Sequence, residues 1–200
     1  MSRDVLAALA NPVAAASAAA APSAASSAAA SPSPQGPHYA SPQDPCRLVK
    51  ATTLARYAPG AAAKQIPAPV DTVPGTPQLS NCGWIALNGS LVLDLTIDAD
   101  SASAQQGYEF AVQYARHNAN GTTFNGAQTV TGVGQQATAI FQTVSIASGE
   151  SHTVVLFVWS GNADIEISFT HEPFGSEPSR ATKLAADIAM ARDVLAALPS

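Results

Sequence analysis

The two cysteines, Cys46 and Cys82, are the residues best placed to form a covalent cross-link. An even pair of cysteines in a chain with few charged residues is typical of a disulfide formed in an oxidising compartment. Two buried free thiols are the alternative. A metal site is less favoured, because no histidine or further cysteine lies at ligand spacing from either residue. A disulfide would join a first helix to the start of a strand and restrain residues 61–80 between them.

Carboxylates and histidines are the next candidates for chemistry. Asp94, Asp98 and Asp100 could offer oxygen ligands to calcium, but the segment lacks the glycine and closing glutamate of a dedicated site. We interpret them as the solvent face of a strand and its exit. His152 and His171 are expected to approach each other across a hairpin, where they could form a weak metal site or a pH-sensitive pair. An ordinary pair of polar residues at the sheet edge is favoured.

One glycine motif resembles a cofactor site. Residues 132–137 read GVGQQA and match the dinucleotide pattern, but that pattern needs a helix after it to hold the pyrophosphate. The strand-like ATAIFQTV follows instead, which favours a glycine turn entering a strand. The hydrolase signatures G-x-S-x-G and H-E-x-x-H are absent. The sequence therefore predicts no catalytic, cofactor-binding or metal-ligating residues and a protein that is not an enzyme, although a deep pocket with two or more convergent titratable groups would favour one.

The first element that must position these residues is a helix. Asp44 and Pro45 are a capping residue and a first-turn proline, so they predict a helix through CRLVKATTLARYAPG. A second short helix can restart at Thr52 or Thr53. Residues 61–80 contain several prolines and glycines with little periodicity, which predicts a long loop.

Antiparallel strands follow, because the hydrophobic pattern changes to period two. The predicted strands cover residues 83–87, 91–98, 137–146, 152–160 and 163–171. Asn88-Gly89 and Gly161-Asn162 are typical two-residue hairpin turns.

Two further helices are predicted, at 101–118 and 180–198, with a Gly/Asn-rich loop after the first. In the first helix, one side carries Ala104, Tyr108, Ala111, Val112 and Ala115. In the second, Leu184, Ile188, Ala191, Leu195 and Leu198 form the predicted buried stripe, and Lys183, Asp187 and Asp193 lie elsewhere.

This element order, α-β-β-α-β-β-β-α, predicts an α+β fold in which helices pack on an antiparallel sheet of about five strands. Residues 44–200 are expected to form a single disulfide-linked domain. Residues 1–43 are rich in Ala, Ser and Pro and are expected to be a disordered linker, since they lack the bulky apolar residues that would offset the entropy of ordering.

The charge distribution excludes one class of partner. The chain has 14 acidic and 9 basic residues, and its formal net charge is −5. It contains no run of Lys or Arg that would attract a phosphate backbone, so nucleic acid is not an expected partner.

Four motifs together resemble a known family. They are Asp44–Leu48 (DPCRL), Cys82–Trp84 (CGW), Gly132–Ala137 (GVGQQA) and the closing LAALP at 195–199. Over about residues 44–199 the chain resembles small actinobacterial cell-envelope lipoproteins of unknown function. It is more loosely similar to the extracellular sensor domains of mycobacterial transmembrane Ser/Thr kinases. The resemblance implies that Cys46 pairs with Cys82 and that Trp84 packs in the core.

The resemblance also implies an extracytoplasmic location, in the cell envelope or secreted. We expect a noncatalytic domain that binds an unidentified envelope ligand or protein through the sheet face or a cleft beside residues 61–80. A sensor module of a signalling system is the alternative, and an enzyme without a recognisable motif is less favoured.

A near-repeat joins the two ends of the chain. Residues 1–10 read MSRDVLAALA and residues 190–199 read MARDVLAALP, with eight of ten positions identical. We expect that the chain is the second half of a tandem or of a longer reading frame. An export signal and any lipid attachment, and thus any membrane tethering, would then lie upstream. Chance recurrence of an Ala/Leu-rich helix is the alternative.

Overall fold

The computed structural model describes residues 36–66, 77–86, 89–117, 121–146, 149–171 and 176–200. Most of the expected 1–43 linker therefore lies outside the described residues, and so does the amino-terminal copy of the repeat. The contacts of the domain begin before residue 44. The Tyr39 N–H donates to Asn162 Oδ1 at 2.6 Å, and the Ala40 N–H donates to the Pro199 carbonyl at 2.8 Å.

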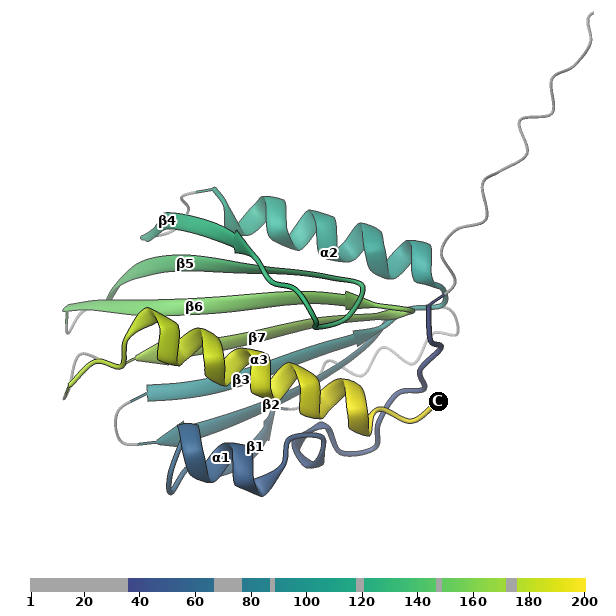
Figure 1. The fold of residues 1–200 in the computed structure, drawn as a ribbon, viewed down its shortest axis with the longest axis horizontal. Helices are drawn as coiled ribbons and strands as arrows, with labels where there is room; N and C mark the ends of the chain where they lie inside the picture. Colours follow the sequence, from purple (N-terminus) through teal and green to yellow (C-terminus); the bar gives the residue numbers. More distant parts are fainter. Residues whose placement is uncertain (1–35, 67–76, 87–88, 118–120, 147–148, 172–175) are drawn as a thin grey trace, which may run out of the picture. The chain divides into compact units, whose positions relative to one another are not determined.

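The described residues form one antiparallel sheet of seven strands in the order β1-β2-β3-β7-β6-β5-β4 (Figure 1). The strands are β1 (Ala62–Ile66), β2 (Gln78–Ala86), β3 (Gly89–Ile97), β4 (Thr122–Thr129), β5 (Gln136–Ile146), β6 (Gly149–Ser160) and β7 (Ala163–His171). Three α-helices pack on the sheet: α1 (Ala51–Tyr57), α2 (Ser101–Ala115) and α3 (Arg180–Ala197). The predicted α+β class with an antiparallel sheet is confirmed.

The predicted count of about five strands is wrong, because β1 and β4 lie in segments predicted to be loops. Both are edge strands, β1 pairing with β2 and β4 with β5. An edge strand buries little of either face, so its sequence need not alternate. None of the β4 side chains is fully buried, and the register of β4 shifts between Phe124 and Gly126. The observed order is α1-β1-β2-β3-α2-β4-β5-β6-β7-α3.

Two predicted hairpins are confirmed by the strand register. Ala86 pairs with Gly89 between β2 and β3, and Ser160 pairs with Ala163 between β6 and β7. Gly161 has φ +58°, and a Cβ there would collide with the Pro37 carbonyl, so this turn needs glycine for both conformation and space.

The helices cover the two faces of the sheet unequally. A 3₁₀ turn (Pro45–Arg47), α1 and α3 belong to the larger core, which contains Trp84 and the inward residues of β3 and β7. In Figure 1, α3 passes in front of the central strands. α2 packs on the opposite face over β5, β6 and β7. The helix expected from Asp44 is split into two. The 3₁₀ turn ends at Arg47, and α1 begins at Ala51, close to the predicted restart at Thr52 or Thr53.

The buried side of α3 is the predicted one only in part, because Ala191 and Leu198 are buried as expected but other positions differ. Lys183, Asp187 and Asp193 are buried, while Leu184, Ile188 and Leu195 are only partly buried. Two of the charged groups have partners inside the fold. The Lys183 ammonium donates to the His152 carbonyl at 2.7 Å, and Asp193 accepts from the Thr53 hydroxyl at 2.6 Å. Periodicity alone could not show these partners, because they come from β6 and α1.

The disulfide between Cys46 and Cys82 is present, and the two Cα atoms are 5.2 Å apart. It joins the 3₁₀ turn to β2, although Cys82 lies in the middle of that strand and not at its start as predicted. Trp84 lies in the core two residues further along β2 with 1% of its surface exposed. Among the described residues, no helix has both the length and the apolar character needed to span a membrane.

Candidate functional site

The second face of the sheet is only partly covered, because α2 is its one covering helix in the described chain. α2 buries Ala104, Tyr108 and Val112 against Phe157 and its neighbours on β5 and β6, as the predicted apolar side requires. Asp100 caps the helix, and its Oδ1 accepts from the Ser103 N–H at 2.8 Å. Asp100 therefore has a structural role as the cap of α2, which differs from the role of a calcium ligand.

A groove runs along the side of α2, where the helix no longer covers the sheet. It consists of two cavities of about 400 Å³ and about 180 Å³ that share Ala111, Phe157 and Glu166 in their linings. We call this combined surface the α2 groove. Its larger part lies against Phe110 and Tyr114, and its smaller part contains three carboxylic acids: Asp94, Asp164 and Glu166.

The sheet register brings these acids together. Asp94 of β3 is the cross-strand partner of Glu166 of β7, and Asp164 lies two residues before Glu166 on the same face. Carboxylates directly opposite each other on one face repel when both are ionised. Burial, followed by the charges of Asp94 and Asp164, raises the pKa of Glu166 to about 7.

The pKa values of the neighbouring acids, Asp164 and Asp94, are raised as well. Burial and then the charge of Asp98 raise the pKa of Asp164 to about 7, and burial also raises the pKa of Asp94. The Asp164 Oδ1 atom is buried without a hydrogen-bond partner among the described residues. These acids are thus more than the solvent face of a strand, because α2 and the opposing strand limit their contact with water.

Aromatic rings form the other side of the groove. Phe110 and Tyr114 are 70% and 62% exposed, and their stacked ring centroids are 6.2 Å apart. Large aromatic side chains bury their area in most folds, so two exposed rings beside a cavity indicate a surface available for contact. No Lys or Arg occurs among the described residues that line the groove.

The raised pKa values predict a stability that falls as the pH rises. Between about pH 4 and pH 7 the folded chain keeps protons on Glu166 and Asp164 that the unfolded chain has released, so this stabilisation is lost as the pH rises through about 7. From about pH 5.5 to about pH 8 we expect urea unfolding to show a loss of about 4 kcal/mol, about 2 kcal/mol from each acid. In Glu166→Gln the loss should be smaller by about 2 kcal/mol.

The matched control is Glu150→Gln, which removes the same charge from an exposed position on β6. The stability of this variant should keep the full pH dependence of the wild type. Glu177 and Asp193, whose pKa values are lowered, add a loss of stability only at more acidic pH. Equal pH dependence in the wild type and Glu166→Gln would contradict this account of the groove.

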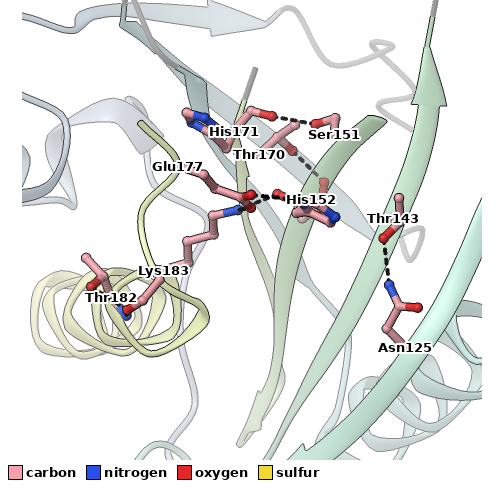
Figure 2. A network of polar contacts seen from close by, with 11 residues as sticks. Asn125, Thr143, Ser151, His152, Thr170, His171, Glu177, Thr182 and Lys183 are labelled. Carbon is pink, nitrogen blue, oxygen red and sulfur yellow. Dashed lines mark hydrogen bonds and ion pairs between the residues drawn. The ribbon is translucent and has the colours of Figure 1, made fainter. Parts of the chain in front are cut away.

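A second polar cluster lies on the opposite face, at the start of α3 (Figure 2). Glu177 Oε1 accepts from Lys183 Nζ at 2.7 Å, and its Oε2 lies 2.9 Å from His152 Nδ1. The His171 ring points away from His152, and its Nδ1 is buried without a partner among the described residues (Figure 2). The two residues lie next to the Thr153–Thr170 pair on adjacent strands, as expected, but their rings do not form a pair, because His152 contacts Glu177 instead.

Other candidate sites have different surroundings. Within the described ranges, no group of three or more His, Cys, Asp or Glu side chains could hold a metal ion. The GVGQQA turn has positive φ at Gly132 and Gly134 and leads into β5, as predicted for a glycine turn entering a strand. An apolar cavity of about 340 Å³ between α1 and the ends of β3 and β7 is lined by Tyr57, Leu91, Phe169 and their neighbours, without a carboxyl or basic group among the described lining residues.

Sequence reasoning missed the main elements of the groove: Phe110, Tyr114, Asp164 and Glu166. The signal available for the acids was the polar face of ADIEISFTH combined with that of LVLDLTID, which β3–β7 pairing superimposes. Comparison of the chain with protein-family models, with curated proteins and with solved structures finds no match in any of the three.

Proposed function

We propose that this protein is a noncatalytic extracytoplasmic domain of the bacterial cell envelope, and that it binds an organic cation in the α2 groove. The cation is an ammonium or guanidinium group on an apolar body, either free or carried by a protein. The observation that carries the proposal is the pairing of Asp94 with Glu166 beside the exposed rings of Phe110 and Tyr114. The disulfide and the resemblance to envelope lipoproteins support the location.

Charge complementarity favours a cation over other ligands. A cation placed between Asp94 and Glu166 would relieve their mutual repulsion, and binding would favour the ionised form of both acids. The exposed aromatic faces can contact either the apolar body or the charge itself, because aromatic rings attract cations. Since no Lys or Arg lines the groove in the described chain, its acids have no permanently charged counterion there, and His117 is the one histidine in the lining.

An enzyme is the second candidate, and the same acids favour it. Two convergent carboxyl groups with pKa values near 7 have the properties of a general acid and a general base. Binding is preferred because the groove lining in the described chain includes no cysteine, serine, lysine or arginine to act as a nucleophile or to stabilise a developing negative charge. Its histidine, His117, lines the larger part of the groove, whereas Asp94 and Asp164 line the smaller part. Turnover of a substrate that is lost in both Asp94→Asn and Glu166→Gln would establish the enzyme instead.

The binding proposal is tested with a matched pair of small probes. Phenethylamine and 2-phenylethanol share an aromatic body and differ in charge. In calorimetric titrations at about pH 8, the amine should bind roughly tenfold more tightly than the alcohol, a difference of about 1.4 kcal/mol. Glu166→Gln should remove this preference because it removes the central carboxylate.

The control variant is again Glu150→Gln, which should keep the preference for the amine. Phe110→Ala should weaken the binding of both probes, since both contact the exposed aromatic rings of the groove. Equal affinity of the wild type for the amine and the alcohol would overturn the proposed function.

A further inference from the structure

The polar cluster at the start of α3 surrounds a small cavity of about 160 Å³, on the face of the sheet opposite the α2 groove. Its lining includes Arg180, Lys183, His152 and Glu177. At roughly 30 Å³ per water molecule in the liquid, this space corresponds to about five waters. It can therefore hold a small polyatomic ion.

The positive charges of this cavity exceed its negative charge. Glu177 is the single carboxylate among the described residues of the lining, and it already bridges Lys183 and His152. Burial opposes its ionisation, but the bonds from Lys183 and His152 lower the pKa of Glu177 below its ordinary value. The carboxylate of Glu177 thus shows that these two side chains stabilise an anion.

Among the residues that the structure describes, Arg180 has no such counterion. Its guanidinium lies over the Phe141 ring, with Cζ 4.3 Å from the centroid, and no hydrogen bond or ion pair reaches it from the described residues. A guanidinium carries five N–H donors arranged for bidentate contact with oxyanions. Lys183 is only 2% exposed and has a third donor beyond its two bonds to the His152 carbonyl and Glu177.

We propose that this cavity binds a small oxyanion, a phosphate or carboxylate group, between the guanidinium of Arg180 and the ammonium of Lys183. Glu177 is an internal competitor, because its carboxylate holds the ammonium that the ligand would share. Removing the charge of Glu177 therefore strengthens anion binding, and removing that of Arg180 weakens it. This site is independent of the α2 groove, which selects the opposite charge.

Titration of the ¹⁵N-labelled protein with inorganic phosphate and, separately, with acetate tests the proposal. We expect saturable shifts of the amides near residues 152 and 180–183 with at least one anion. Arg180→Gln should weaken binding about tenfold, and Glu177→Gln should strengthen it severalfold. Arg192→Gln, on the exposed side of the same helix, is the matched control and should change neither affinity.

The two anions distinguish the sources of the ligand group. Saturation by phosphate alone assigns the site to phosphate groups, and saturation by both assigns it to oxyanions in general. Saturation by acetate alone assigns it to carboxylates. The absence of saturable shifts in both the wild type and Glu177→Gln, or equal affinities of the wild type and Arg180→Gln, would overturn the proposal. Arg180 is exposed, so its variant should not impair folding. Glu177→Gln removes the charge beside the buried Lys183 ammonium but keeps a side-chain oxygen that can accept its hydrogen bond, and the amide spectrum of the unliganded variant checks its fold.

Discussion

Removing the Cys46–Cys82 disulfide should lower the free energy of unfolding by about 4 kcal/mol. The bond links residues separated by 36 positions, and in the chain-entropy model a loop of this size restricts the unfolded chain by that amount. The measurement is urea unfolding of the oxidised protein and of the Cys46→Ala/Cys82→Ala double variant.

A comparison with the reduced wild type separates the cross-link from lost packing. Cys82 is fully buried, so the double variant also loses the burial of its sulfur, whereas the reduced protein loses only the bond. The reduced protein should be nearly as unstable as the double variant. A loss below about 1 kcal/mol in the reduced protein would show that the disulfide contributes little to stability.

Trp84→Ala should destabilise the fold by roughly 3 to 5 kcal/mol, the range seen when large buried aromatic residues are truncated. Trp84 is 1% exposed and belongs to the core beneath α1 and α3, opposite Leu91 on β3. Its removal would leave a cavity in the layer that the disulfide also restrains, so the core could relax only in part.

Trp84→Phe is the matched control. The indole Nε1 has no hydrogen-bond partner among the described residues, so phenylalanine loses ring volume but no bond. It should cost about 1 to 2 kcal/mol, clearly less than alanine. Equal costs for the two variants in thermal and urea unfolding would mean that packing of the ring is not what Trp84 supplies.

The central hairpins and the α2 core could be predicted because their signals are local. Asn88-Gly89 and Gly161-Asn162 predict turns between alternating strands, and both hairpins are observed, although Gly89 already pairs with Ala86 as the first residue of β3. The edge strands β1 and β4 could not be predicted in this way, because AAKQI and TTFNGAQT do not alternate apolar and polar residues, and no side chain of β4 is fully buried. Each is held by pairing with the next strand along the chain, β2 for β1 and β5 for β4, and the pattern of its own side chains does not show this.

The candidate site depended even more on tertiary placement. Alternation correctly assigned Asp94 to the polar face of its strand, but it could not show that Glu166 lies directly opposite or that α2 limits the access of water. The same reason explains α3. Its Leu residues suggested the buried stripe, yet Lys183 is buried because Glu177 and the His152 carbonyl accept its hydrogen bonds.

The most direct test of the central claim is to map where an organic cation binds. In ¹H–¹⁵N spectra of the wild type titrated with phenethylamine at about pH 8, the account predicts saturable shifts around Asp94, Phe157 and Glu166 and along α2 from residue 110 to 115. The same titration of Glu166→Gln should give weaker shifts at these positions. Shifts confined to the apolar cavity near Tyr57 and Phe169, or no saturable shifts at all, would contradict the assignment of the α2 groove as the binding site.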